Sequence, residues 1–536
     1  NSSSKLIVNQ RNYTPFDCSL LNVNGDYRTY NITNPDGANI ALKLSVIYHG
    51  LANAKRSTHK NTYANNALTN PGSSIITPKC NGSKSLTQKV ISGGGLSNIT
   101  TNYQYSQNPG YWDSEIAPSY TYSVNVPAFM STAAQKSLHK YVIETRQDGS
   151  KTVYFFNRDA QSYLENKLVA RDDYDTDGVT LLKRNITSYE QGEYLGWANI
   201  LGGRTNREPL HYRQHLKAES NQYFYGNESD VFTTENITFN EYGIVTKQKE
   251  SNDFNSKIKY TKQSYLHNTA NWVLNLPTTT EISSDNSDYT TVNETTYYPS
   301  DHANYPLLPE YIKSYGTWLK KYSDYHADGN IQKIEYNEKL TFGDTAANSY
   351  QIFSGFKRGR PQTRIVPKQY GTGTESETIV VDDNGWLVQS TDFENNIVNY
   401  GYDDLGRIKY VDPVDTKWTD KLFTWNYAAG TASNQPQRTE KQCTLNLEKN
   451  ACSSTVLFST TITLDALLRS LLVTTTDGTN TVYKNSSFNA NHQVEFTSFP
   501  SGSSTETKGI TSTYDGLKRL KMKSQSGGGT VTSDYL

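Results

Sequence analysis

A short pattern of aromatic, acidic and apolar positions recurs along the chain, and it is clearest in two places. It reads YDDLGRI at 402–408 and YDGLKRL at 514–520. The residues that define it are Tyr402, Asp403, Gly406, Arg407, Tyr514, Asp515 and Arg519. An Asp that opens a type I turn can accept a hydrogen bond from the backbone two residues on, and a Gly three positions later can adopt positive φ. The pattern therefore predicts a β-hairpin turn, with the aromatic residue and the Arg on its two strands.

Weaker copies of this unit lie between and before the two clear ones. Asp465 and Arg469 preserve the charged pair, Phe488 preserves the aromatic residue, and further copies begin at Val381, Phe239 and Tyr325. Starts at 381 and 402 are 21 residues apart, and starts at 464, 488 and 514 are 24 and 26 apart. A period of this length holds two strands and two turns, and one hairpin cannot bury its own apolar face. Stacked hairpins can share one long sheet, so we predict an all-β strip in which each unit contacts mainly its neighbours.

One segment leaves two structures open. Tyr311, Tyr315, Trp318 and Tyr322 recur at helical spacing. The range 309–322 is therefore either an amphipathic helix or a pair of irregular strands.

Composition supports strands and excludes several classes of protein. The 536 residues carry 52 Lys and Arg against 53 Asp and Glu, so no uniform field attracts nucleic acid or anionic membrane. Aromatic residues make up 12%, including 40 Tyr, which argues against disorder and favours β-structure. No apolar run approaches the roughly 18 residues that a membrane helix needs. The chain starts with Asn1 rather than Met, and we expect it to be a trimmed or processed piece.

The four cysteines give one candidate bridge. Cys443 and Cys452 flank eight residues between two Thr- and Ser-rich strand candidates, a spacing that suits a bridged hairpin. Such a bridge would stabilise by roughly 2 to 3 kcal/mol and would imply an oxidising, extracytoplasmic destination. Free thiols are the alternative, and the pairing of Cys18 and Cys80 is left open.

The alternation T-D-x-x-x-N-x-x-x-Y-x-Y-D-x-x-G-R from Thr391 to Arg407 resembles the YD repeat of the Rhs proteins. That family includes bacterial polymorphic toxins, the B and C components of insecticidal toxin complexes, and the teneurins. The resemblance is strong over 320–536 and weaker over nearly all of the rest. It implies a strip of β-hairpins that spirals into a hollow shell, with few or short helices. In bacterial members the shell encloses a C-terminal toxin.

The sequence departs from the family where bacterial shells usually end. No Asp-Pro-x-Gly-Leu segment is present, and Asp412-Pro413 is followed by Val414-Asp415. The end of the shell, any self-cleaving protease and any toxin are therefore expected outside this chain. We divide the chain into a β-rich opening segment at 1–140, degenerate hairpin repeats at 141–370, and clear repeats at 371–536 that continue past the chain end.

Other motifs favour ordinary turns over chemistry. The segment 173–178 matches the first half of a calcium loop, but its twelfth position is Arg184 instead of Glu. His211 and His215 are four apart without the Glu of a zinc protease. The basic run 357–361 stands alone, without the further basic runs that DNA binding needs. We therefore expect no catalytic residue, metal or cofactor.

These observations lead to one functional prediction and one alternative. The chain is expected to be a secreted or cell-surface wall segment that sequesters a toxin or cargo. Its expected partners are the remaining shell, the C-terminal toxin domain and a secretion-system component, with no nucleic acid. The alternative is a surface adhesin or carbohydrate-binding module, because the aromatic density also suits sugar stacking.

Overall fold

A computed structural model gives the fold of this chain. It describes residues 27–34, 37–48, 82–106, 131–157, 164, 167–194, 212–342, 345–427 and 435–532. Within these ranges lie 32 strands and one short helix. The predicted all-β class is confirmed, and Cys18, Cys80 and His211 lie outside the described residues.

The elements follow one another along the chain with short connections. The first group is β1 Tyr27–Thr33, β2 Asn39–Tyr48, β3 Gly82–Gly93, β4 Leu96–Tyr105, α1 Thr132–Leu138, β5 Lys140–Arg146, β6 Lys151–Phe156, β7 Leu168–Tyr174 and β8 Leu181–Tyr194. The middle group is β9 Tyr212–Tyr225, β10 Glu228–Phe239, β11 Val245–Asn252, β12 Ile258–Asn268, β13 Val273–Ser283, β14 Thr290–Tyr297, β15 Pro309–Ser314, β16 Thr317–Tyr325, β17 Ile331–Phe342, β18 Thr345–Ser354, β19 Thr363–Pro367, β20 Thr374–Val381, β21 Leu387–Thr391, β22 Ile397–Tyr402, β23 Ile408–Pro413, β24 Lys421–Asn426 and β25 Gln437–Gln442. The last group is β26 Phe458–Leu464, β27 Ser470–Thr476, β28 Thr481–Phe488, β29 Val494–Ser498, β30 Gly509–Tyr514, β31 Leu520–Gln525 and β32 Thr530–Thr532.

Every strand pairs antiparallel with the strand before it and the strand after it. This order holds without a crossover from β1–β2 to β31–β32. Among the described strands, β1 pairs only with β2 and β32 only with β31, so the sheet is not closed into a barrel. The result is one continuous strip.

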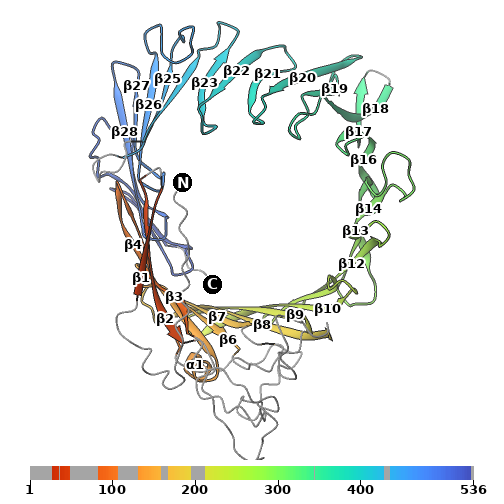
Figure 1. Cartoon of the computed structure of the whole chain (residues 1–536), viewed down its shortest axis with the longest axis vertical. Helices are drawn as coiled ribbons and strands as arrows, with labels where there is room; N and C mark the ends of the chain where they lie inside the picture. The colour runs from red at the N-terminus through yellow and green to blue at the C-terminus, as the bar shows by residue number, and fades with distance from the viewer. Residues whose placement is uncertain are drawn as a thin grey trace, which may run out of the picture.

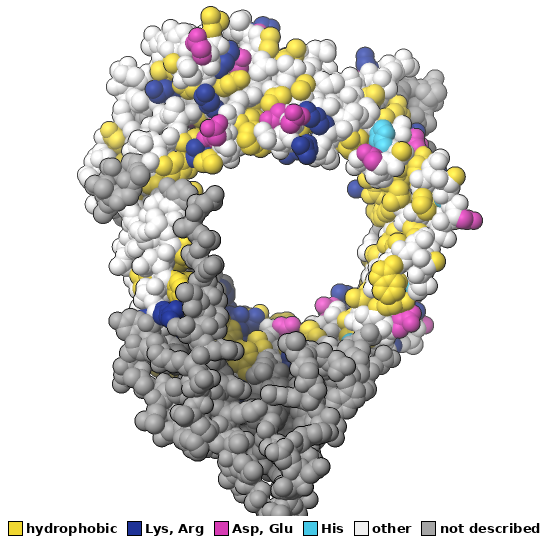
Figure 2. Space-filling view, viewed as in Figure 1, with side chains coloured by type: hydrophobic (Ala, Val, Ile, Leu, Met, Phe, Trp, Pro, Cys, Tyr) yellow, Lys and Arg dark blue, Asp and Glu magenta, His cyan; other side chains and the backbone are white. Residues whose placement is uncertain are grey.

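The strip curves into a ring around an open centre (Figure 1). After one circuit β28 returns to the side where β1 and β4 lie (Figure 1). Figure 2 shows that the side chains leave the centre of the ring open. We call the circuit that starts at β1 the first lap, and the strands from β26 onward the start of the second lap.

Because most of the ring is one layer thick, deep burial is confined to a few places. One core cluster contains Val153, Phe155, Val169, Ala170 and Tyr174 on β6 and β7. Here α1 lies on the outer side of the ring (Figure 1), where His139 at its end packs edge-on against Phe155. A second cluster forms under the loop that follows β25.

The helix also covers a buried ion pair. Nε of Arg184 on β8 donates to Oδ1 of Asp172 on β7 at 2.7 Å, and Asp172 is fully buried. The hydroxyl of Thr132 in α1 donates to the other carboxylate oxygen of Asp172 at 2.8 Å. Since an unpaired charge at this site would be costly, the three residues fix α1 to the sheet.

The segment at 309–322 is a β-hairpin, which decides between the two structures left open by its spacing. β15 and β16 meet at a tight turn in which Tyr315 and Gly316 both have positive φ, 46° and 77°. Trp318 packs edge-on against Tyr311 across this pair of strands.

Candidate functional site: repeat turns and the seam

The predicted repeat motif forms the same turn wherever it is clear. At 403–407, Oδ1 of Asp403 accepts hydrogen bonds from the backbone N–H groups of Leu405 and Arg407, both at 3.0 Å. The N–H of Gly406 donates to the carbonyl of Asp403 at 2.9 Å, and Gly406 has φ +77°. This is the turn that the sequence pattern predicts, with the Gly at the positive-φ position.

Other copies repeat these bonds with different residues. The side chains that accept from the backbone two and four residues on are those of Asn240, Asp382, Asp392, Asp465, Asn489 and Asp515. We call this unit the Asx turn. In three copies the positive-φ position holds a residue other than Gly, namely Leu468, His492 and Lys518.

The Arg of the motif clamps the turn that precedes it. Nε of Arg407, Arg469 and Arg519 donates to Oδ2 of the Asp four residues earlier, at 2.6, 2.6 and 2.7 Å. Burial alone would raise the pKa of Asp403, but its bonds to Arg407 and to the turn backbone lower that pKa below its usual value. The carboxylate is therefore held in its charged form.

The same Arg side chains link each hairpin to the next. The guanidinium of Arg407 lies 5.1 Å from the ring centre of Trp425 and 4.8 Å from that of Tyr427. Arg469 lies 4.5 Å from the ring centre of Phe488, the aromatic residue of the following copy. Cation–π contacts of this kind stabilise by roughly 0.5 to 1 kcal/mol at exposed sites.

The motif tyrosines make the reverse link to the preceding hairpin. The hydroxyl of Tyr402 donates to the carbonyl of Leu387, and that of Tyr514 to the carbonyl of Val494, both at 2.8 Å. Each acceptor lies five residues after the Asx residue of the preceding copy. Aromatic, Asp and Arg together thus connect three consecutive hairpins.

Three contacts that the sequence did not reveal hold the second lap against the first. The N–H of Ala466 donates to the carbonyl of Gly94 at 2.9 Å. Nδ2 of Asn491 donates to Oδ2 of Asp148 at 2.5 Å. The N–H of Gly516 donates to Oδ1 of Asp175 at 2.9 Å. We call these three contacts the seam.

The seam has a constant spacing. It joins the turn after β3 to the turn after β26, the turn after β5 to that after β28, and the turn after β7 to that after β30, an advance of 23 strands each time. In each contact the first-lap turn supplies the acceptor and the second-lap turn supplies the N–H donor. The laps are therefore in register with each other.

Close approach at the seam depends on small residues. A Cβ added to Gly516 would lie 2.2 Å from the carbonyl oxygen of Tyr174, and one added to Gly93 would lie 2.3 Å from Cβ of Ala466. Gly516 is thus a contact residue between laps, and the positive φ of its turn falls at Lys518.

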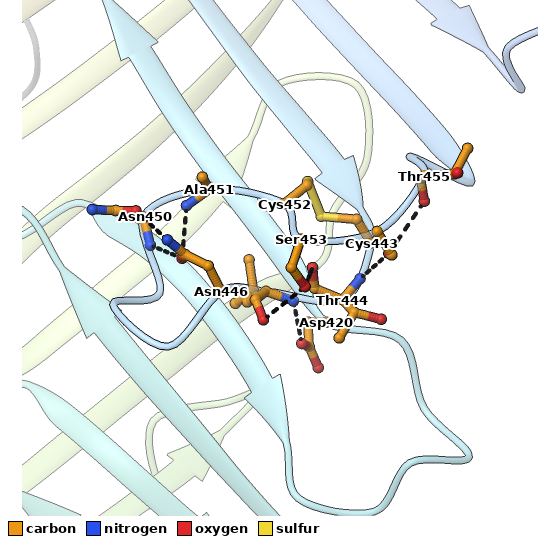
Figure 3. The surroundings of a disulfide bond; sticks show 11 residues. Asp420, Cys443, Thr444, Asn446, Asn450, Ala451, Cys452, Ser453 and Thr455 are labelled. Atoms are coloured by element: carbon orange, nitrogen blue, oxygen red, sulfur yellow. Dashed lines mark hydrogen bonds between the residues drawn. A yellow bond between two sulfur atoms is a disulfide. The ribbon is translucent and has the colours of Figure 1, made fainter.

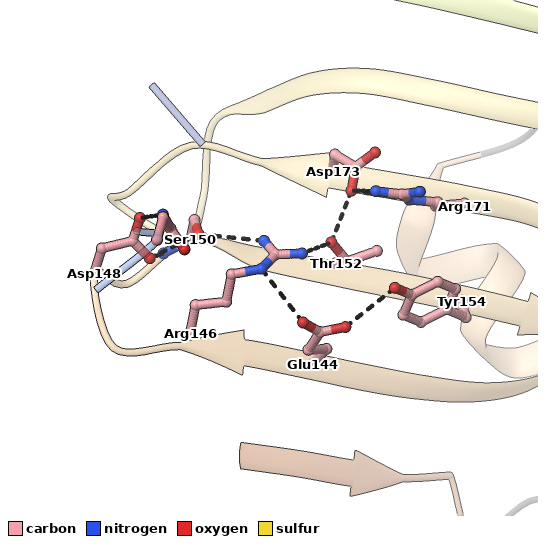
Figure 4. Close-up of polar contacts among 9 residues, drawn as sticks. Glu144, Arg146, Asp148, Ser150, Thr152, Tyr154, Arg171 and Asp173 are labelled. Carbon is pink, nitrogen blue, oxygen red and sulfur yellow. Dashed lines mark hydrogen bonds and ion pairs between the residues drawn. The ribbon is translucent and has the colours of Figure 1, made fainter. Parts of the chain in front are cut away.

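A polar network on β5, β6 and β7 supports the first-lap side of the seam (Figure 4). Oδ1 of Asp148 accepts from the hydroxyl of Ser150 at 2.7 Å, while Oδ2 of the same carboxylate is the seam acceptor. The guanidinium of Arg146 donates to Ser150 and to Thr152. The hydroxyl of Thr152 donates in turn to Asp173 at 2.7 Å. Asp148 is therefore held in a fixed orientation for Asn491.

The calcium-like segment is part of the same edge. Oδ1 of Asp175 accepts from the N–H groups of Thr176 and Gly516, and Oδ1 of Asp177 accepts from those of Val179 and Thr180. Hydrogen bonds from Thr180 and Val179 lower the pKa of Asp177 to about 2. These carboxylates serve the turn and the seam. His215, from the paired-histidine motif, stacks on Phe239 at 4.2 Å.

The bridge expected between Cys443 and Cys452 is present, and it closes the loop between β25 and β26 (Figure 3). Oδ1 of Asn446 accepts from the N–H groups of Asn450 and Ala451, and the N–H of Leu445 donates to Asp420 at 2.9 Å. Cys443 is fully buried against Leu422 and Leu445. The loop thus adds a second layer over β24.

No family model matches the sequence, and no curated protein matches it. Solved structures do match. A TcdB2-TccC3 crystal structure superposes with a TM-score of 0.55 at 12% identity, over 94% of this chain and 34% of that chain. The Photorhabdus luminescens Tc holotoxin pore gives 0.56 at 11% identity, over 94% and 35%. The chain thus spans about a third of the length of these neighbours, and what it shares with these toxin-complex chains is the fold.

Proposed function

We propose that this chain is a wall segment of a hollow toxin-complex shell, and that it sequesters a toxin or cargo polypeptide which it does not itself contain. The observation that carries the proposal is the continuous strip of neighbour-paired hairpins, curved around an open centre and joined to itself at the seam. The fold shared with toxin-complex chains supports it.

The mechanism we propose is steric. In a sheet whose strands are all paired along the strip, the backbone is engaged in ladders that an extended substrate would need to displace before a protease could cleave. The Asx turns and the seam would keep this wall closed between hairpins and between laps. None of these roles requires a catalytic residue, so we propose that the chain is not an enzyme.

We further propose that the wall acts outside the cytoplasm, together with the remaining shell, a C-terminal toxin domain and a secretion-system component. The disulfide at Cys443 supports an oxidising location. In the described part of the chain, no helix is long and apolar enough to cross a bilayer.

A protease-protection assay tests the proposal. The chain is co-expressed with the polypeptides encoded beside it, the complex is purified, and survival of each partner is followed during digestion with proteinase K. A sequestered partner should survive at least about tenfold longer than the same partner alone, and weakening the seam with Gly516→Val should shorten that survival. Equal digestion rates with an intact wall would rule out sequestration.

A second candidate function is glycan binding, which one groove favours. Trp418 is 65% exposed and lines a groove of about 360 Å³ together with Tyr400, Pro413, Asp392 and Asp415. An exposed indole beside carboxylates is suited to stacking on a sugar ring. Glycan-array binding that disappears in Trp418→Ala would support this function, and an array without signal would reject it.

A further inference from the structure

The seam turns carry a residue choice that distinguishes them from other Asx turns. The residue after the Asx position is Ala466, Ala490 or Gly516 in the three seam turns. In the turns after β10, β20 and β22 the same position holds Glu241, Asp383 or Asp404, and all three are exposed. A small residue at this position lets the backbone approach another lap, whereas an acidic residue suits solvent.

The first-lap turn that comes next in the series is the one between β9 and β10. Its tip, Gly226-Asn227, is exposed, and a Cβ added to Gly226 would meet no described atom within 4 Å. At the seam, a Cβ added to Gly95 would lie 2.3 Å from the side chain of Gln435. The β9–β10 turn thus has the place of a seam turn without a second-lap neighbour among the described residues.

The turn also offers the chemistry of a seam acceptor. First-lap seam turns supply oxygen atoms, from the Gly94 carbonyl and the Asp148 and Asp175 carboxylates. The β9–β10 turn presents the amide oxygen of Asn227 and the carboxylate of Glu228, both on exposed residues.

The edge of β32 provides the second half of a docking site. β32 pairs with β31, and in the described part of the chain no strand pairs with its other edge. Its three residues are exposed. By the spacing of 23 strands, the turn following β32 falls opposite the turn following β9. A hairpin added to β32 would therefore place its turn at Asn227.

We infer that the corner formed by β32 and the β9–β10 turn is the docking site for one further Asx-turn hairpin, carried by a partner polypeptide, with Gly or Ala after its Asx residue. The inference rests on the proposed shell function and names the partner that extends the wall. The first strand of the partner hairpin pairs with β32, and backbone N–H groups at its turn donate to Asn227 and Glu228.

Charge argues against a second copy of this chain as the occupant. Its exposed Asx turns would bring Glu241, Asp383 or Asp404 against Glu228, and like charges in close contact are unfavourable. The three turns with a small residue are already engaged in the seam.

A peptide in trans tests this inference on the full chain. The probe has the sequence of Gly509–Gln525, the β30–β31 hairpin, closed by a terminal disulfide so that the hairpin is preformed. Binding is followed by fluorescence anisotropy, and the contact is located by hydrogen exchange. We expect saturable binding below about 1 mM, with slowed exchange at both 225–229 and 530–532.

Two matched changes make the result specific. A control peptide with Glu in place of the glycine after its Asp should bind at least tenfold more weakly, and the protein variant Glu228→Lys should weaken the native peptide similarly. Absence of saturable binding, or protection confined to other strands, would overturn the inference. Concentration-dependent self-association that the peptide abolishes would assign the corner to a second copy instead and would equally overturn it. None of these outcomes depends on whether a cargo is protected from protease.

Discussion

The N–H of Gly516 donates to Oδ1 of Asp175 at 2.9 Å, although 341 positions separate the two residues in sequence. Lys521, on the strand after this turn, also lies 3.7 Å from the other oxygen of Asp175. Each ladder in the strip joins strands that are neighbours in sequence, so this contact belongs to the small set that determines how one lap sits on the other.

Gly516→Val is expected to open this part of the seam. The new Cβ would lie 2.2 Å from the carbonyl oxygen of Tyr174, and backbone on both sides must shift to relieve the overlap. Hydrogen exchange should become faster at 174–178 and 514–518. Gly502→Val is the matched control, because a Cβ there meets nothing within 4 Å. Unchanged exchange at both segments would show that the seam does not depend on close approach.

Removing the Asp of an Asx turn should cost more where the turn is buried. Asp465 is fully buried with Arg469 paired to it, so Asp465→Ala leaves a largely buried guanidinium and should cost about 3 kcal/mol. Asp403 is 26% exposed, and Asp403→Ala should cost about 1 to 2 kcal/mol. The free energies of local opening, from hydrogen exchange at 467–469 and 405–407, give the comparison. Asp404→Ala, on an exposed neighbour, should change little, and equal costs at 403 and 465 would contradict the role of burial.

Acidification should weaken the seam near His492. Burial, together with the positive charges of Arg469, Lys518 and first-lap Lys89, lowers the pKa of His492, while Asp465 opposes this shift. Because the folded pKa lies below the unfolded value of about 6.5, the native state is unpenalised above that pH and loses stability as the pH falls through it.

The measurement is the thermal midpoint, and exchange at 489–493, between pH 7.5 and pH 5. His492→Asn, which tolerates the positive φ of 67°, should flatten the dependence. His215→Gln, on β9, should leave it unchanged. A wild-type seam equally stable across this range would contradict the assignment to His492.

Reducing the disulfide should loosen β24 and β25 locally. The bridge closes a loop with a sequence separation of nine, for which roughly 2 to 3 kcal/mol of stabilisation is expected. The double variant Cys443→Ser with Cys452→Ser should show faster exchange at 421–426 and 437–442, with β10 and β11 as the internal reference. Identical exchange in the oxidised and reduced protein would show that the packing of Leu422 and Leu445 alone holds the loop.

Lys518→Gly should stabilise its turn by about 0.5 to 1 kcal/mol. Lys518 has φ +67°, a conformation that costs an L-residue more than Gly. Lys523→Gly, in the middle of β31, should be destabilising instead, since Gly weakens a strand. The thermal midpoints of the two variants should therefore move in opposite directions.

The part of this structure that depends on local chemistry could be predicted from the sequence. Asp403, Gly406 and Arg407 interact within five residues, so their spacing alone defines the turn, and repetition of the turn predicts the strip. The spacing at 309–322 was ambiguous because a two-residue turn between short strands can imitate a helical period.

The seam could not be predicted in the same way. Asp148 and Asp175 occupy ordinary turns, and their second-lap partners lie more than 300 positions away. One local signal was present: Ala466, Ala490 and Gly516 follow an Asx residue where other copies have an acid. That signal becomes interpretable only when the curvature of the strip is known. The three-part division of the chain into segments stays a prediction.

The strictly sequential pairing of strands has a consequence for biosynthesis. Each hairpin finds its partner in the hairpin made just before it, so the sheet can lengthen in step with translation, and no strand waits for a distant segment. The first circuit would then serve as a template on which later hairpins are laid down in fixed phase, as a thread follows the pitch of a screw. An error in hairpin count would displace every subsequent turn, so the number of strands per circuit is expected to tolerate insertions and deletions less well than the lengths of individual loops.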